Sequence, residues 1–227
     1  MATTRRNFLA SSAALAAVLT PSLAAVSAAA QEKPRWRTGV GLNGFMSSAQ
    51  AYNKNYPIWE ILDFTANEGF DGVELVDSWP MGGYPSPDES GRIAALKRMY
   101  TQYGLQIYTI QTFGSGCYSA DPNARRDWVA RFREYVRLCQ ALGCEFIGHW
   151  PGGDLQGNAN VDEAIANLVS SYKEAAQICA DAGMHMSFEI EPPFIFNTMD
   201  HLQRILTGVN HPACKTNYDP SHFDLMS

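Results

Sequence analysis

Several common signatures are missing from this sequence of 227 residues. It contains five cysteines, an odd number, and no two are spaced as C-x-x-C, so no zinc finger is predicted. Charged residues make up only 18%, and acidic residues outnumber basic ones by 23 to 17. Binding to nucleic acid depends on basic residues that neutralise phosphates, so this class of partner is disfavoured.

The cysteines are expected to be small buried side chains rather than a disulfide framework. Cys139 and Cys179 fall on the apolar faces of predicted helices, and free cysteine behaves as a small hydrophobe. A disulfide would be allowed in an oxidising compartment, and this alternative stays open.

The first thirty residues differ from the rest of the chain. Arg5-Arg6 opens a short basic segment, Leu9–Leu23 is rich in alanine and leucine, and Ala28–Ala30 offers small residues for cleavage. Residues 1–30 therefore resemble a twin-arginine export signal, which predicts a periplasmic or otherwise exported protein. An uncleaved N-terminal anchor is the alternative.

Cleavage of that signal would leave residues 31–227 as one domain. This part holds 15 basic and 23 acidic residues, a net charge of −8. No stable membrane insertion is expected after cleavage. The length is sufficient for one domain with a substantial core.

One pattern recurs from residue 39 onward, in which a helix ends at a glycine and an apolar strand follows. The glycines at these junctions are 35, 39 and 40 residues apart, which is the length of a strand–helix unit. They are Gly69, Gly104, Gly143 and Gly183. The predicted helices are 58–68, 87–103, 122–142, 161–182 and 198–206, and the predicted strands are 39–44, 72–76, 105–110, 145–150, 186–191 and 215–219.

Alternating strands and helices permit an open doubly wound sheet or a closed barrel. Gly39–Gly44 is assigned to the first strand itself, so no GxGxxG motif is expected after that strand, and a dinucleotide-binding domain is disfavoured. Polar residues gather where the strands end, as in the active sites of barrel enzymes. They are Asn43, Glu74, Thr112, His149, Glu191 and Asp219. The prediction is an α/β fold of the (β/α)8 TIM-barrel type.

Two glutamates alternate with apolar residues near residue 190. The period of two puts Glu189 and Glu191 on one face of a strand and Phe188 and Ile190 on the other. Buried carboxylates need a partner or a metal, so both glutamates are candidates. Glu191, at the tip of the strand, is favoured as a metal ligand and catalytic residue, and Glu189 is expected one layer deeper.

The segment Asp219-Pro220-Ser221-His222 reads as a strand end followed by a bend. A carboxylate and an imidazole three residues apart across a bend can reach one divalent cation. Asp219 and His222 are therefore predicted to bind the same metal as Glu191. Oxygen ligands with one nitrogen suit Mn²⁺, Mg²⁺, Co²⁺ or Zn²⁺.

These segments resemble the xylose isomerase-like TIM barrel superfamily of sugar phosphate isomerases and epimerases, dehydratases and family 2 AP endonucleases. Glu191-Pro192 and Asp219–His222 carry the resemblance, and residues 70–75, with Glu74, are similar to the family's second strand. The resemblance implies that Glu191 and Asp219 bind a metal, that Glu191 acts as an acid or base, and that His222 contacts substrate or metal. It also implies that Glu74 faces the substrate pocket.

The family usually has eight strands, with a metal-binding histidine on the seventh and a metal-binding, catalytic glutamate on the eighth. Only about six of the eight units are found between residue 39 and residue 227. A truncated product is therefore the favoured interpretation, and a protein that has lost the usual activity is the alternative.

Two residues at the end of the fourth strand are further candidates for substrate binding. His149 could contact a sugar or a second metal, or could be hydrogen-bonded beneath the turn that follows. Trp150, with Trp79 and Phe113, could form an apolar wall against a sugar ring, or could belong to the core. Thr112–Gly116 could bind phosphate or form an ordinary loop.

The sequence thus predicts a metal-dependent sugar isomerase or epimerase that moves a proton next to a carbonyl group. A dehydratase or lyase on the same scaffold and an inactive carbohydrate-binding remnant are the alternatives. An AP endonuclease is disfavoured by the acidic charge. The predicted partner is a small sugar or polyol derivative, and a homo-oligomer is possible.

Overall fold

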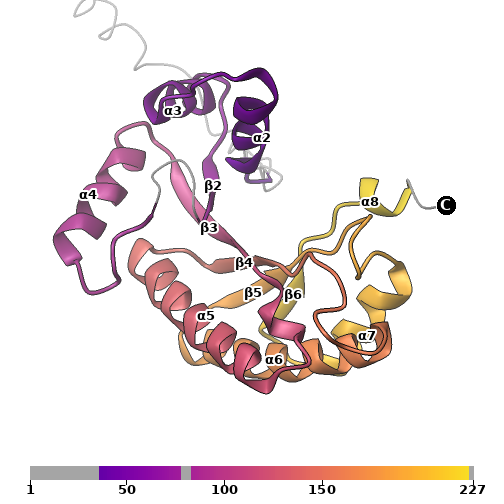
Figure 1. Ribbon diagram of the computed structural model, residues 1–227. Coiled ribbons are helices and arrows are strands. Elements are labelled where there is room, and N and C mark those ends of the chain that lie inside the picture. The colour runs from indigo at the N-terminus through magenta and orange to yellow at the C-terminus, as the bar shows by residue number, and fades with distance from the viewer. Residues whose placement is uncertain (1–35, 78–82, 225–227) are drawn as a thin grey trace, which may run out of the picture. The chain divides into compact units, whose positions relative to one another are not determined.

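Strands and helices alternate along the chain (Figure 1). The computed structural model describes residues 36–77 and 83–224, and the described residues from Arg37 onward form one compact unit. The predicted export signal and Trp79 lie outside the described residues. The strands are β1 (Gly39–Gly41), β2 (Gly72–Val76), β3 (Gln106–Phe113), β4 (Phe146–Trp150), β5 (His185–Phe188) and β6 (Cys214–Thr216). The helices are α2 (Asn43–Tyr52), α3 (Ile58–Asn67), α4 (Ser90–Thr101), the 3-10 helix η1 (Ser115–Tyr118), α5 (Pro122–Leu142), α6 (Val161–Asp181), α7 (Met199–Val209) and α8 (Ser221–Asp224).

The six strands form one parallel sheet in the order β1-β2-β3-β4-β5-β6. Each strand pairs with the next one along the chain, as in a barrel, so the predicted α/β class is confirmed. Gly39, Gly41 and Gly44 do have the GxGxxG spacing, across the end of β1 and the start of α2. The sequential order nevertheless differs from the 3-2-1-4-5-6 order of a dinucleotide-binding sheet.

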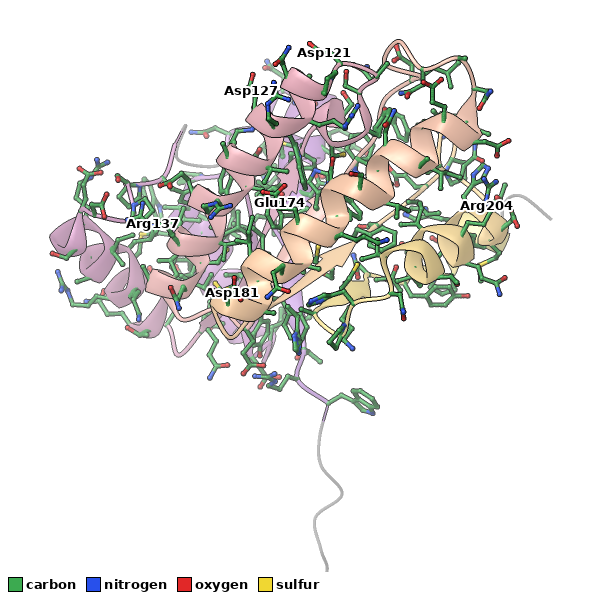
Figure 2. All side chains as sticks on the ribbon, turned by 90° about the horizontal axis from the view of Figure 1, so that it is seen from below. Asp121, Asp127, Arg137, Glu174, Asp181 and Arg204 are labelled. Atoms are coloured by element: carbon green, nitrogen blue, oxygen red, sulfur yellow. The ribbon has the colours of Figure 1, made fainter. Side chains whose placement is uncertain are left out.

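The helices cover the sheet in chain order. Helix α4 contacts β3, α5 contacts β3 and β4, α6 contacts β5, and α7 contacts β6. Neighbouring helices also contact one another, and Figure 2 shows α5, α6 and α7 side by side with charged residues such as Glu174 and Arg204 on them. The opposite face of the sheet is the one on which a barrel places its polar interior.

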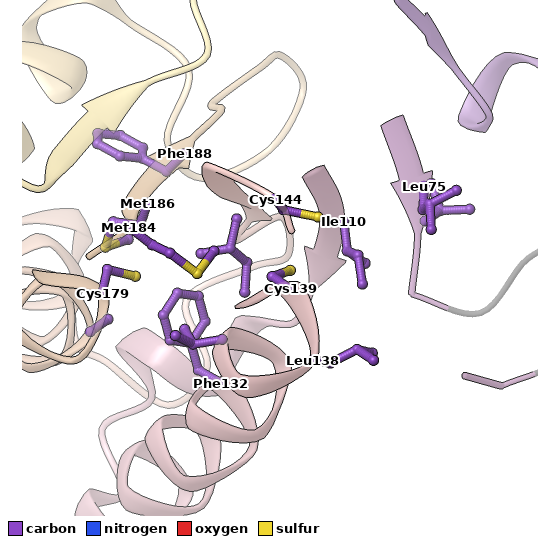
Figure 3. Close-up of a cluster of buried hydrophobic side chains, with 14 of the residues drawn as sticks. Leu75, Ile110, Phe132, Leu138, Cys139, Cys144, Cys179, Met184, Met186 and Phe188 are labelled. Carbon is purple, nitrogen blue, oxygen red and sulfur yellow. The ribbon is translucent and has the colours of Figure 1, made fainter. Parts of the chain in front are cut away.

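Apolar side chains fill the layer between the sheet and the helices (Figure 3). Leu75, Ile110 and Met186 come from the strands, and Phe132 and Cys179 come from α5 and α6. All five cysteines are buried and free, which confirms the prediction that they act as small core side chains. Each Å² of apolar surface removed from water stabilises the fold by about 25 cal/mol, so this layer is the main source of stability.

The ends of the two longest helices agree with the sequence prediction. At the start of α5, Asp121 accepts a hydrogen bond from the amide of Asn123, and Pro122 is the first helical residue. At the start of α6, Asn160 accepts from the amide of Glu163, and the Glu163 carboxylate accepts from the amide of Ala159. Because these short-range bonds need no tertiary contact, they can be predicted locally.

Two predictions about helices were wrong. The helix expected from residue 87 begins instead at Ser90, because the Glu89 carboxylate accepts the Ser86 amide and holds the chain in a turn. Helix α2 was not predicted, and the strand expected at 39–44 ends at Gly41. No residue of α2 is fully buried, and Phe45 packs only partly buried against the core, so its apolar pattern is weaker than that of α5 and α6.

None of the helices in the described ranges is long and apolar enough to cross a membrane.

Candidate metal centre

The centre begins just beyond the ends of β5 and β6. The amide of Glu189 donates to the carbonyl of His149, and the amide of Asn217 donates to the carbonyl of Phe188. The strand pairing therefore continues for one residue, so Glu189 and Asn217 lie side by side in the same layer. Asn217 Nδ2 donates to Glu189 Oε2 over 2.9 Å.

A short helix brings the histidine back toward this layer. Asp219 Oδ1 accepts from the amide of Ser221 at 2.8 Å and from its hydroxyl at 2.7 Å, and these two bonds lower the pKa of Asp219. The amide of His222 donates to the carbonyl of Asp219 at 3.3 Å. The bend predicted from Asp219 to His222 is therefore present, and it turns the imidazole toward the carboxylates.

Three carboxylates converge on one nitrogen atom of His222. From Nε2, Glu191 Oε2 lies at 3.0 Å, Glu189 Oε1 at 3.2 Å and Asp219 Oδ2 at 3.5 Å. One N–H can donate well to only one of these oxygens, so the arrangement leaves negative charge unpaired. Ligand atoms of Glu189, Asp219 and His222 all lie within 4.8 Å of one another. Two carboxylates and an imidazole are a suitable donor set for a divalent transition metal or Mg²⁺.

The sequence favoured Glu191 over Glu189 as the ligand, and in the structure both carboxylates lie within 3.2 Å of His222 Nε2. The compact group contains Glu189, whereas Glu191 stands beside it. Strand β5 ends at Phe188, so Glu191 does not continue the strand as expected, and its carboxylate approaches His222 from a loop. Burial raises the pKa of Glu191, while the nearby His222 opposes that shift.

Glu74 also faces this side of the sheet. It lies on β2 opposite Gly41 of β1, and its carboxylate lies next to that glycine. Burial raises the pKa of Glu74 to about 7, and the negative charge of Glu189 acts in the same direction. The carboxylates of Glu74 and Glu189 are therefore close enough to interact electrostatically.

His149 does not join the centre. Its imidazole is buried on the opposite face of β4, where Nε2 accepts from the Trp128 indole at 3.1 Å and Nδ1 bonds the Tyr172 hydroxyl at 2.7 Å. Burial lowers the pKa of His149 to about 3, so the ring is neutral. With both nitrogens engaged, the structure supports the alternative of a histidine held within the fold. Neither ring nitrogen of His149 is free to bind a substrate, as the prediction of a substrate-binding role would require.

Trp150 lies next to the carboxylates. The ring is half-buried, it packs edge-on against Phe194 at 4.6 Å and Phe113 at 5.9 Å, and it folds over Gly152. Burial raises the pKa of Glu191, and a hydrogen bond with Trp150 is one of the contacts that oppose this rise, so the indole lies next to this carboxylate. The expected pairing of Trp150 with Phe113 is therefore present beside the candidate site.

The glycine-rich loop after β3 shows no free phosphate cradle. The amide of Gly114 donates to the carbonyl of Trp150, and Thr112 Oγ1 donates to the carbonyl of Gly148. The residues from Ser115 form η1. These hydrogen-bond donors of the loop are paired with carbonyl groups of the protein itself, in agreement with the alternative of an ordinary structural loop.

Comparison with known proteins identifies the fold independently. A family model described as Xylose isomerase-like TIM barrel matches residues 62–226. No curated protein matches the chain. A crystal structure of IolI protein with a bound zinc atom is 15% identical, with a TM-score of 0.68, and the alignment covers 84% of this chain and 65% of that one.

Two further solved structures carry activities in their descriptions. D-psicose 3-epimerase from Clostridium cellulolyticum H10, solved with D-tagatose, is 20% identical, with a TM-score of 0.63 over 80% of this chain and 62% of that one. The probable 3-DHS dehydratase AsbF from Bacillus anthracis is 16% identical, with a TM-score of 0.60 over 84% and 65%. The chain thus spans less than two thirds of the length of each of these three proteins. The matched residues, together with the parallel sheet and its sequential order, show that the chain belongs to the Xylose isomerase-like TIM barrel family.

Proposed function

We propose that this chain carries part of a metal-dependent sugar isomerase or epimerase. The observation that carries the proposal is the convergence of three carboxylate oxygens on His222 Nε2, all within 3.5 Å. Glu189, Asp219 and His222 would hold the cation, and the chemistry of these ligands suits Mn²⁺, Mg²⁺, Co²⁺ or Zn²⁺. When bound, such a cation supplies positive charge that stabilises an oxygen next to the reacting carbon.

Glu191 is the residue proposed to move the proton. It stands beside the metal-binding group rather than within it, and it is tied to Trp150, so its carboxylate can face a substrate. A positioned carboxylate can take the proton from a carbon next to a carbonyl group. An isomerisation needs one such base, because the proton can return to the adjacent carbon. An epimerisation needs a second acid on the opposite face of the substrate.

Other residues would shape the substrate pocket. Trp150, supported by Phe113 and Phe194, offers an aromatic surface next to the carboxylates, where the apolar face of a sugar ring could pack. Glu74 and His222 would contact substrate hydroxyl groups. Four carboxylates near one another favour an uncharged sugar or polyol derivative over a phosphorylated one.

A dehydratase is the second candidate, since one similar structure is described as a probable dehydratase. Both reactions begin with removal of a proton next to a carbonyl group, so the same residues would serve. The two differ in the product, because a dehydratase expels a hydroxyl group as water.

The experiment combines metal analysis with product analysis. We expect the full chain to bind about one Mn²⁺, and both Glu189→Gln and Asp219→Asn to weaken that binding by tenfold or more. Incubation with ketoses in D₂O should place deuterium on the carbon next to the carbonyl, as detected by NMR, and Glu191→Gln should abolish this exchange while metal is still bound. Loss of water from the substrate would select the dehydratase. If the chain binds no divalent metal, the proposal is wrong.

A further inference from the structure

Each of the two carboxylates in the metal-binding group has one oxygen already occupied. Glu189 Oε2 accepts the amide of Asn217 at 2.9 Å. Asp219 Oδ1 accepts both the amide and the hydroxyl of Ser221, at 2.8 Å and 2.7 Å. The occupied oxygens are thus held by neutral donors of the protein itself.

The other two oxygens face the same point. Glu189 Oε1 lies 3.2 Å from His222 Nε2, and Asp219 Oδ2 lies 3.5 Å from the same atom. Each carboxylate therefore presents a single oxygen toward the imidazole, and its orientation is fixed by the bond on its other oxygen.

Asn217 is itself held firmly against β5. Its backbone amide donates to the carbonyl of Phe188 at 2.9 Å, and the hydroxyl of the preceding Thr216 donates to the same carbonyl at 3.0 Å. Its side-chain amide starts from this fixed backbone and reaches the neighbouring Glu189. The bond is therefore part of the sheet edge and not a contact of a mobile loop.

We propose that Asn217 is a positioning residue that limits Glu189 to one metal-binding oxygen, with Ser221 doing the same for Asp219. This inference rests on the proposed function, because it assumes that the group binds a divalent cation. Carboxylates limited to one oxygen suit a small cation with few ligands. Ca²⁺ takes six to eight oxygens and often binds carboxylates through both of theirs, so the arrangement disfavours it.

Calorimetric titration of the full chain with MnCl₂ and with CaCl₂ tests this role. Partners that orient a metal ligand typically contribute 10–100-fold in affinity, so Asn217→Ala should weaken Mn²⁺ binding by about that factor. Ca²⁺ binding should weaken less, because Glu189 gains freedom to offer both oxygens, and the preference for Mn²⁺ over Ca²⁺ should therefore narrow. The unfolding midpoint of the metal-free variant should stay close to that of the wild type.

Gln177→Ala is the matched control. Gln177 Nε2 donates to Asp181 Oδ1 at 2.7 Å, so this variant also removes an amide–carboxylate bond, but on the exposed surface of α6. It should leave the affinities for both cations unchanged. Ser221→Ala provides a second variant, with the same expected direction, in case Asn217→Ala does not fold.

The outcomes separate the inference from the function on which it rests. If the wild type binds Mn²⁺ and the Asn217 and Ser221 variants bind both cations as tightly, the positioning role is refuted while the metal centre stands. A uniform loss of affinity for Mn²⁺ and Ca²⁺, with no change in preference, also refutes it. If the wild type binds neither cation, the inference and the proposed function both fail.

Discussion

At the scale of single residues, His149 and Glu189 show what a linear pattern leaves undecided. Both lie close to the end of a strand, but the histidine faces the helices and the glutamate faces the opposite side of the sheet. Which side chain points inward depends on the strand register, and a shift of one residue reverses the face. Types of residue could be predicted at the strand ends, whereas their faces were settled only by the pairing with neighbouring strands.

Strand pairing also distinguishes the positions of Glu189 and Glu191. The sequence pattern indicates that both point to one side, and the one nearer the tip was favoured as the ligand. The sheet ladder continues only as far as Glu189, where Asn217 on the neighbouring strand fixes the carboxylate. The shared face of Asn217 and Asp219 was visible in the sequence, and it was the signal that could have identified Asn217 as a neighbour of the carboxylates.

The buried imidazole of His149 leads to a prediction about acid stability. Burial lowers its pKa to about 3 in the folded protein, against an ordinary value of 6.5; a hydrogen bond with the backbone of Gly114 opposes the shift and the charge of Arg131 adds to it. Below pH 6.5 the unfolded chain binds a proton that the folded chain does not bind until about pH 3. This residue therefore stabilises the fold above pH 6.5 and loses that contribution as the pH falls toward 3.

The expected contribution is about 1.4 kcal/mol of unfolding free energy per pH unit within that window. Urea unfolding at several pH values between 7.5 and 4 would measure it. His149→Gln removes the titration, so stability should fall less steeply with decreasing pH in the variant. Equal slopes for the two proteins would contradict the prediction, whatever their stability at pH 7.5.

At the scale of helices and strands, local chemistry predicted correctly where the two longest helices begin, whereas four of the six predicted strands end three residues away from the observed strand ends. Helices α5 and α6 begin at capping residues and have a continuous apolar face, so propensity and pattern agree. Helix α4 starts late because one glutamate bonds backward to the turn. Helix α2 has no fully buried residue and contributes only partly buried side chains such as Phe45 to the core, so its apolar pattern is weak.

The end of α5 gives a prediction at this scale. Gly143 has a φ of 86°, and the amides of Gly143 and Cys144 bond back to Gln140 and Cys139. An alanine there would need a left-handed backbone, which costs roughly 1–2 kcal/mol. Gly143→Ala should therefore lower the unfolding free energy by about that amount, as measured by urea denaturation.

A second glycine provides the control for that substitution. Gly91 is the second residue of α4, and a Cβ added to it would meet nothing within 4 Å. Alanine is the better helix former by roughly 0.5–1 kcal/mol, so Gly91→Ala should stabilise the protein slightly. If both variants changed stability in the same direction, the conformational explanation would be wrong.

For the whole molecule, the fold class followed from the spacing of repeated units. Four glycines separated by 35 to 40 residues marked the ends of helices, and each junction leads into a strand of the parallel sheet. Repetition at this scale is stronger evidence than any single motif. The substrate cannot be deduced in the same way, because pocket loops differ in sequence and carry no repeating pattern.

At the scale of the whole molecule, the predicted export signal in residues 1–30 can also be tested. Arg5 and Arg6 are the specific part of the predicted signal, so replacing both by lysine should block transport while the folded domain stays unchanged. Immunoblotting of periplasmic and cytoplasmic fractions would show the shorter, processed protein in the periplasm for the wild type and the precursor in the cytoplasm for the variant. Processed protein in the periplasm at the same level for both would exclude the twin-arginine route.

The five buried thiols have a practical consequence for studying this molecule. None is exposed in the folded protein, so a thiol-reactive dye can reach them only when the core opens, and the rate of labelling reports that opening directly. Conversely, one cysteine introduced on the surface, for example in place of Ser90 at the start of α4, would be labelled alone in the native state. A fluorophore or spin label could then be placed at a chosen position without removing any native cysteine.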